Sequence, residues 1–142
     1  MPNFNLLPPF LTSSNMDKKT ILIVDDDNST RLLLGFLLKQ QYQVFTKKDG
    51  MEAMLWLNEG NLPDLILLDM SMPRLSGYNF LLNLRKSGFF KDVPVIIVSG
   101  SDRLKDIEFF LQNKRNDFLH KPFNPQNLFK KVEKALNPPI ID

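Results

Sequence analysis

The sequence contains no cysteine, no long apolar run and no marked excess of charge of one sign. The lack of cysteine excludes disulfides, thiol chemistry and thiolate metal sites. No apolar stretch approaches the roughly 18–20 residues that a membrane span needs. The 18 basic and 16 acidic side chains give a net charge of only +2, which does not by itself indicate a nucleic-acid partner. We therefore expect a cytoplasmic protein that contacts neither membrane nor nucleic acid.

The first 17 residues are apolar but interrupted by proline. Their large apolar side chains are Phe4, Leu6, Leu7, Phe10 and Leu11, and the prolines are Pro2, Pro8 and Pro9. The segment has neither a basic start nor a continuous apolar core, so it is not typical of a signal peptide. The rest of the chain is long enough for one domain with its own core. We expect a flexible extension over residues 1–17, one domain over residues 18–137 and a short tail over residues 138–142.

Short apolar runs alternate with helical patterns along this domain. Strands are predicted over residues 20–24, 44–46, 64–69, 93–98 and 117–120. Helices are predicted over residues 29–41, 50–58, 78–86, 102–113 and 125–136. Because a helix separates each strand from the next, the strands cannot form hairpins, and the sheet must be parallel and covered on both faces. The pattern predicts an α/β fold with a doubly wound, five-stranded parallel sheet in three α/β/α layers.

The helix predicted over residues 102–113 is strongly apolar. Leu104, Ile107, Phe110 and Leu111 share one side of it at helical spacing. Phe109 and Phe110 are adjacent, so they cannot both face fully inward. Two interpretations stay open: a wide buried stripe, or an exposed aromatic side chain that anchors a partner or a second copy of the chain.

Polar side chains follow four of the five predicted strands. Asp25 and Asp26 end the first strand, Asp69 the third and Ser99 the fourth, and Lys121 follows the fifth. A doubly wound sheet places its site outside the carboxyl ends of its strands. Three carboxylates in contact repel one another, and a divalent cation removes that cost; oxygen ligands suit Mg²⁺. These parts suit phosphoryl transfer to Asp69 as the nucleophile, with Lys121 and Ser99 facing the phosphoryl oxygens.

Each feature alone has a simpler interpretation. The acidic run at Asp25 can be a helix N-cap region, and Asp69 can begin a turn. Ser99 resembles any strand end, and a lysine before proline is commonly a surface residue. The functional interpretation gains weight because four strand ends each supply suitable chemistry.

Four ordered segments carry a family resemblance. They are residues 21–27, residues 64–73 with Gly77, residues 94–100 and residues 121–123. Together they resemble the receiver domain of bacterial two-component signalling, and the resemblance runs from about Lys18 to Leu136. It implies a flavodoxin-like receiver fold and a response regulator in a phosphorelay. Its donor would be a histidine kinase or phosphotransfer protein, and the chain would not be an enzyme beyond its own phosphorylation and dephosphorylation.

The resemblance also assigns roles around the acidic residues. Asp69 corresponds to the phosphoacceptor and is also expected to be a Mg²⁺ ligand. Asp26 corresponds to the direct Mg²⁺ ligand, and Asp25 to the residue that acts mainly through water. Ser71, two positions after the acceptor, would give its backbone carbonyl to the metal.

The same resemblance implies a conformational switch. Ser99 would turn toward the phosphoryl group, which Lys121 would pair with, and Phe118 would rotate from exposed to buried. The fourth helix, fifth strand and fifth helix would then change their face toward a downstream protein. The family also uses a cis peptide bond at the position of Lys121–Pro122.

Departures and rival interpretations remain at this point. Lys114 and Arg115 replace the Gly-Ala common in receivers, and Met70 either partly covers the site or fills the core. His120, the only histidine, is expected to be a satisfied or solvent-facing strand residue. The alternative function is a receiver-like interaction module that works without phosphorylation. A flavodoxin-like or hydrolase enzyme is disfavoured, because the chain lacks a glycine-rich phosphate cradle and a nucleophile elbow.

Overall fold

The computed structural model describes residues 18–70, 72, 76–100 and 104–138. The predicted extension over residues 1–17, Ser71 and residues 139–142 of the predicted tail lie outside this range. The elements are β1 (Thr20–Val24), α3 (Asn28–Leu38), β2 (Gln43–Lys47), α4 (Gly50–Asn58), β3 (Leu65–Leu68), α5 (Gly77–Lys86), β4 (Val95–Ser99), α6 (Leu104–Leu111), β5 (Asn116–His120) and α7 (Pro125–Leu136). Across these ranges, no helix combines the length and the apolar character that crossing a bilayer requires.

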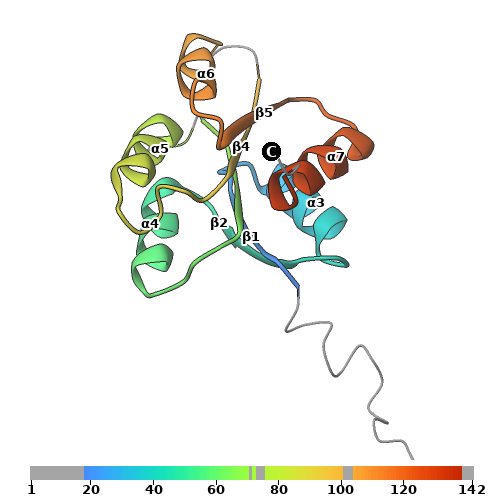
Figure 1. The fold of residues 1–142 in the computed structure, drawn as a ribbon. Coiled ribbons are helices and arrows are strands. Elements are labelled where there is room, and N and C mark those ends of the chain that lie inside the picture. The colour runs from blue at the N-terminus through green and yellow to red at the C-terminus, as the bar shows by residue number, and fades with distance from the viewer. Residues whose placement is uncertain (1–17, 71, 73–75, 101–103, 139–142) are drawn as a thin grey trace, which may run out of the picture.

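The strands form one parallel sheet in the order β2-β1-β3-β4-β5. Helices α3 and α7 cover one face, and α4, α5 and α6 cover the other (Figure 1). The predicted doubly wound, three-layer α/β/α architecture is therefore confirmed. The strand order reverses between β1 and β3, and that reversal opens a crevice at their carboxyl ends, where such sheets bind ligands.

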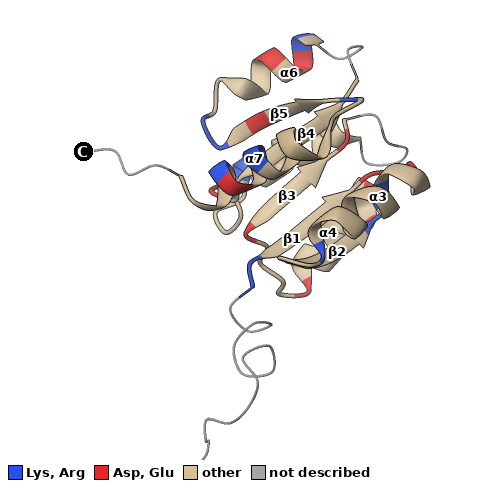
Figure 2. Cartoon of the chain, turned by 90° about the vertical axis from the view of Figure 1, so that its right-hand side faces the viewer, with Lys and Arg blue, Asp and Glu red and all other residues tan. Residues whose placement is uncertain are grey.

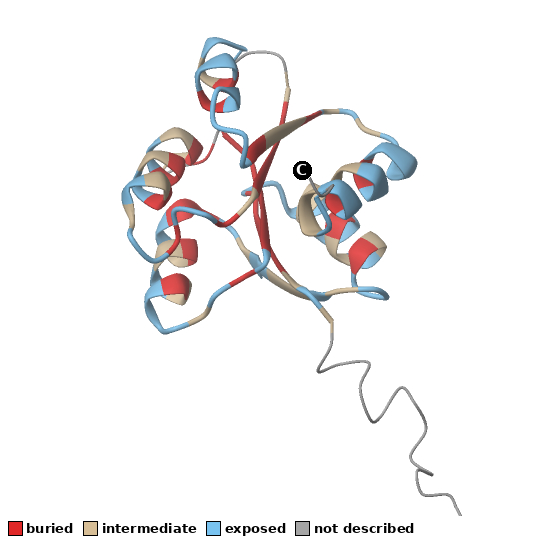
Figure 3. Cartoon of the chain, viewed as in Figure 1, coloured by how far each residue is buried: buried red, intermediate tan, exposed pale blue. Residues whose placement is uncertain are grey.

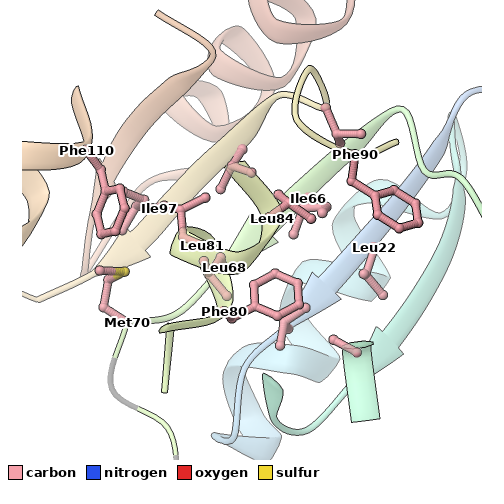
Figure 4. Packing of buried hydrophobic residues seen from close by; sticks show 14 of the residues in the cluster. Leu22, Ile66, Leu68, Met70, Phe80, Leu81, Leu84, Phe90, Ile97 and Phe110 are labelled. Atoms are coloured by element: carbon pink, nitrogen blue, oxygen red, sulfur yellow. The ribbon is translucent and has the colours of Figure 1, made fainter. Parts of the chain in front are cut away.

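The three central strands are buried on both faces (Figure 3). Their near-continuous Ile, Leu and Val sequences suit a parallel sheet between two helical layers. Alternate residues feed two separate cores: Leu22, Ile66 and Leu68 pack toward α4, α5 and α6, while Ile21 and Ile23 pack toward α3 and α7. Figure 4 shows the first of these cores, in which Phe80 lies wholly buried among the strand residues.

Polar side chains cap the helices at their first turns. Asp27 accepts from the Thr30 amide at 2.9 Å, and Asp49 caps α4 in the same way. Asn124 caps α7 with Pro125 at the first helical position. These caps satisfy backbone N–H groups in the first turns of α3, α4 and α7.

Several predicted boundaries are wrong by a few residues. The helix predicted to residue 41 ends at Leu38, because the chain turns there to enter β2 at Gln43, one residue before the predicted start. The fourth strand begins at Val95 rather than Val93, because Pro94 has no N–H to donate to the ladder. Asp69 follows β3 rather than ending it.

The buried face of helix α6 is narrower than the wide buried stripe that the sequence allowed. Ile107 and Phe110 are buried, whereas Leu104 is 53% exposed and Leu111 is 40% exposed. Phe109 is also half-exposed, so the interpretation as a wide buried stripe is wrong. Helix α6 lies at the end of its layer (Figure 1), where only one side of the helix meets the sheet.

Candidate functional site

Three carboxylates meet at the carboxyl ends of β1 and β3. One carboxylate oxygen each from Asp25, Asp26 and Asp69 lie within 4.8 Å of one another. Asp25 is 1% exposed and Asp69 is 7% exposed, whereas Asp26 is exposed to solvent. The Asp69 amide donates to the Val24 carbonyl at 2.9 Å, so sheet pairing itself sets the two strand ends side by side.

Lys121 brings a positive charge to this group from the carboxyl end of the edge strand β5. Its Nζ lies 3.0 Å from Asp25 Oδ2 and 3.9 Å from Asp69 Oδ1. Its amide donates to the Ser99 carbonyl at 2.8 Å, and the Lys121–Pro122 peptide bond is cis, as expected from the resemblance. Lys121 pairs with two of the three clustered carboxylates, which leaves the pocket electronegative and favours a bound cation.

The backbone around Asp25 is held by its neighbours. Asp25 Oδ1 accepts from the Asp27 amide at 2.8 Å, and Arg31 Nη1 donates to the Asp25 carbonyl at 2.7 Å. Hydrogen bonds from the hydroxyl and amide of Thr30 hold the pKa of Asp27 below its usual range. No signal in the sequence indicates that Arg31 belongs to the site, because a basic residue one turn inside α3 is part of no motif.

Gly77 brings α5 against the segment that follows Asp69. A Cβ on Gly77 would lie 2.3 Å from the Asp69 carbonyl oxygen and 2.5 Å from Met70 Cα, so only glycine fits. The Gly77 amide donates to the Met70 carbonyl at 3.2 Å. Met70 itself is fully buried (Figure 4). It therefore fills the core, and the alternative in which it covers the site is wrong.

The two predicted switch residues lie on neighbouring strands. Ser99 ends β4 and is 2% exposed. Phe118 lies on β5, is partly buried, and packs against the core beneath α4, α5 and α6. Its ring lies 6.0 Å from that of His120, which faces solvent. Ser71 lies outside the described residues.

The donor set at the rim suits a hard divalent cation. The three clustered side chains offer only oxygen ligands, which match the preference of Mg²⁺ over that of softer metals. Asp25, Asp26 and Asp69 are the described residues that would hold it.

Known proteins resemble this chain over most of its length. The model of the response regulator receiver domain family matches residues 21–133. The phosphate regulon transcriptional regulatory protein PhoB of Escherichia coli is 31% identical over 119 residues, which are 83% of this chain and 52% of PhoB. A 14.6 kDa protein encoded beside sodA1 in Leptolyngbya boryana is 33% identical over 122 residues, 86% of this chain and 91% of that protein. The chain spans about half the length of the transcriptional regulators that it matches.

Solved structures agree with the sequence relatives. Chemotaxis protein CheY4 of Vibrio cholerae superposes with a TM-score of 0.75 at 28% identity, covering 84% of this chain and 99% of that one. The phosphorylated cyanobacterial phytochrome response regulator RcpA superposes with a TM-score of 0.73 at 29% identity, covering 87% of this chain and 97% of that one. The chain therefore belongs to the response regulator receiver domain family, the phosphoacceptor modules of two-component signalling.

Proposed function

We propose that the chain takes a phosphoryl group from a phosphohistidine donor onto Asp69, with Mg²⁺ bound beside it. The observation that carries this proposal is the convergence of Asp25, Asp26, Asp69 and Lys121 at one rim of the sheet. The donor would be a histidine kinase or a phosphotransfer protein, the partners with which receiver domains interact.

In the proposed transfer, a carboxylate oxygen of Asp69 attacks phosphorus. The new O–P bond replaces the N–P bond to the donor imidazole, which keeps the electron pair. Asp25, Asp26, Asp69 and the Ser71 carbonyl would hold Mg²⁺, which when bound neutralises charge on the phosphoryl oxygens. Lys121 can leave its 3.0 Å contact with Asp25 to pair with those oxygens. Attack of water on the same phosphorus would reverse the modification, so catalysis is confined to the chain's own acyl phosphate.

The switch that we propose follows from the charge of the phosphoryl group on Asp69. A phosphoryl group on Asp69 adds acceptor oxygens, toward which the Ser99 hydroxyl would turn as a donor. The space that Ser99 leaves would admit Phe118, which is only partly buried in this structure. The outer face of α6, β5 and α7 would change accordingly and bind a downstream protein. The phosphoryl group can shift this equilibrium only by interacting differently with the two states.

We also propose that residues 18–137 form the folding unit. In support, the sheet and both hydrophobic cores draw on elements from Thr20 to Leu136. Residues 1–17 and 138–142 would then be an extension and a tail.

The test is the intact mass of the chain after incubation with acetyl phosphate and Mg²⁺. We expect a gain of one phosphate in the wild type that needs Mg²⁺ and is lost in Asp69→Asn. Asp64→Asn is the matched control, because Asp64 flanks the opposite end of the same strand and should leave the gain intact.

The alternative is an interaction module that works without phosphorylation. It would be favoured if neither acetyl phosphate nor a panel of phosphorylated histidine kinases and phosphotransfer proteins modified the wild type. A calorimetric Mg²⁺ titration then separates an intact metal pocket from a pocket that binds nothing.

A further inference from the structure

Helix α3 is apolar on its outer side as well as its inner side. Leu34 and Leu38 face the core, yet Leu32 is 67% exposed and Phe36 is 62% exposed, with Leu33 beside them. Arg31 is its only charged residue, and α3 is almost wholly tan in Figure 2. A helix that is apolar all round is normally covered on all sides. The exposed side of α3 therefore has the character of a covered surface.

A groove of about 490 Å³ runs between this side of α3 and the edge strand β2. Its lining residues are Arg31, Leu32, Gly35, Phe36, Lys39, Val44 and Thr46. A Cβ on Gly35 would meet nothing within 4 Å, so packing inside the described domain does not require glycine there. The glycine instead leaves open space in the groove that Leu32 and Phe36 also line.

The chain itself supplies a matching segment. Residues 1–16 contain no charged side chain, and five of them are Phe or Leu, namely Phe4, Leu6, Leu7, Phe10 and Leu11. Pro8 and Pro9 favour extended backbone over helix. Such a segment can lie in a groove and insert apolar side chains without bringing charge to it.

The segment also joins the domain at a suitable place. The Lys19 carbonyl accepts from the Gln43 amide at 2.9 Å, and the Tyr42 amide donates to the Leu38 carbonyl. Residue 18 therefore lies beside the start of β2 and the carboxyl end of α3. Extended chain covers roughly 3.3 Å per residue, so Phe10 can reach about 25 Å from Lys18. Helix α3, with 11 residues, is only about 16 Å long.

We propose that residues 4–11 bind in cis along the α3–β2 groove, with Phe10 and Leu11 packed against Leu32 and Phe36. A second copy of the chain suits the groove less well. A stable dimer buries about 800 Å² per partner, whereas three exposed side chains along a short helix offer far less. Because α3 starts at the cap beside the acidic pocket, the bound segment would cover the helix next to the phosphorylation site. The inference stands independently of whether Asp69 is phosphorylated.

The absence of native cysteine allows a direct test. A nitroxide label on Asn5→Cys broadens amide signals of nearby residues in a ¹⁵N-labelled full-length chain. We expect at least a two-fold intensity loss at Leu32, Gly35, Phe36 and Val44, and none at Phe109 on the other face. Adding Phe10→Ser and Leu11→Ser should restore these signals. Phe89→Ser, a matched loss of an exposed phenylalanine elsewhere, should not.

Three outcomes would overturn the proposal. One is the absence of broadening at the groove, and another is broadening that survives Phe10→Ser and Leu11→Ser. The third is broadening at the groove when ¹⁵N-labelled chains without a nitroxide are mixed with nitroxide-labelled chains at natural isotope abundance. That result would make the occupant a second copy of the chain. The same spectra report whether each variant is folded.

Discussion

Strand β5 has a buried polar cluster at each end, and the two clusters differ in how their charge is compensated. At its carboxyl end, Lys121 faces the carboxylates of Asp25 and Asp69. At its amino end, Asn116 Oδ1 accepts from Arg85 Nε at 3.2 Å, and Asn116 Nδ2 donates to the Phe110 carbonyl at 2.8 Å.

The amino-end cluster is complete by itself. Arg85 donates to Asn116 and to the backbone carbonyls of Lys91 and Arg115, so neutral acceptors satisfy most of its donors. Burial, with a contribution from Arg115, lowers the pKa of Arg85 to about 10, which leaves it charged at neutral pH. A satisfied, partly buried cation that ties α5 to β5 is a structural feature.

The carboxyl-end cluster is not complete in the same way. Among the described residues, Lys121 pairs with Asp25 and Asp69, and Asp26 adds a third carboxylate within 4.8 Å. Such a gathering of like charge is costly unless a ligand balances it. The comparison teaches that carboxylates gathered in close contact, rather than a charged side chain as such, distinguish the site from the scaffold. Four predictions sharpen or break this distinction.

The largest effect is expected beside the acidic pocket, at Gly77. Gly77→Ala should lower the free energy of unfolding by about 3–5 kcal/mol, because its Cβ would overlap the Asp69 carbonyl and the α5 contact must open. Urea denaturation measures this loss. Gly88→Ala is the control, since a Cβ there meets nothing within 4 Å. Equal, small changes in the free energy of unfolding of both variants would contradict the close approach of α5 to Asp69 and Met70.

The next effect concerns Mg²⁺. Asp26→Asn removes one of the three clustered carboxylates and should weaken Mg²⁺ binding roughly 100-fold, about 2.7 kcal/mol. It should not lower stability without the metal, because like-charge repulsion falls. Calorimetric titration and melting curves with and without Mg²⁺ measure both. A variant that kept the full Mg²⁺-dependent rise in melting temperature would show that Asp26 is not a ligand.

At the other end of β5, the opposite pattern is expected. Asn116→Ala removes the side-chain acceptor of Arg85 and one of the two donors to the Phe110 carbonyl, and should cost about 2 kcal/mol of stability. Its Mg²⁺ affinity should equal that of the wild type. Denaturation and the same titration test this, and a changed Mg²⁺ affinity would mean that the two ends of β5 are coupled.

The smallest effect on stability is expected at Ser99. Ser99→Ala removes one hydroxyl and should change stability by less than about 1 kcal/mol. It should nevertheless abolish the phosphorylation-dependent shift of the Phe118 ring signals in NMR spectra, with Mg²⁺ binding retained. If the shift persisted in phosphorylated Ser99→Ala, Ser99 would not couple the pocket to Phe118.

Much of the architecture could be predicted because it depends on local pattern. The β1 range and the helices over residues 50–58 and 125–136 match the structure, since strong burial periodicity and caps at Asp49 and Asn124 mark their limits. Boundaries failed where hydrogen bonding between strands decided them, as at Pro94, which has no N–H to donate to the ladder. The expected stripe on α6 failed because helical periodicity does not show how much of a helix the sheet covers.

In the candidate site too, some features follow from the sequence and others only from the tertiary structure. Sequence alone determined the alternation of strand and helix, and hence that residues after each strand gather at one rim, because parallel strands separated by helices all point the same way. Only the tertiary structure decided that Lys121 pairs with Asp25, that Arg31 holds the Asp25 carbonyl, and that Gly77 must lack a side chain. These depend on distances between segments that are remote along the chain or joined by a loop, and no local pattern encodes such distances.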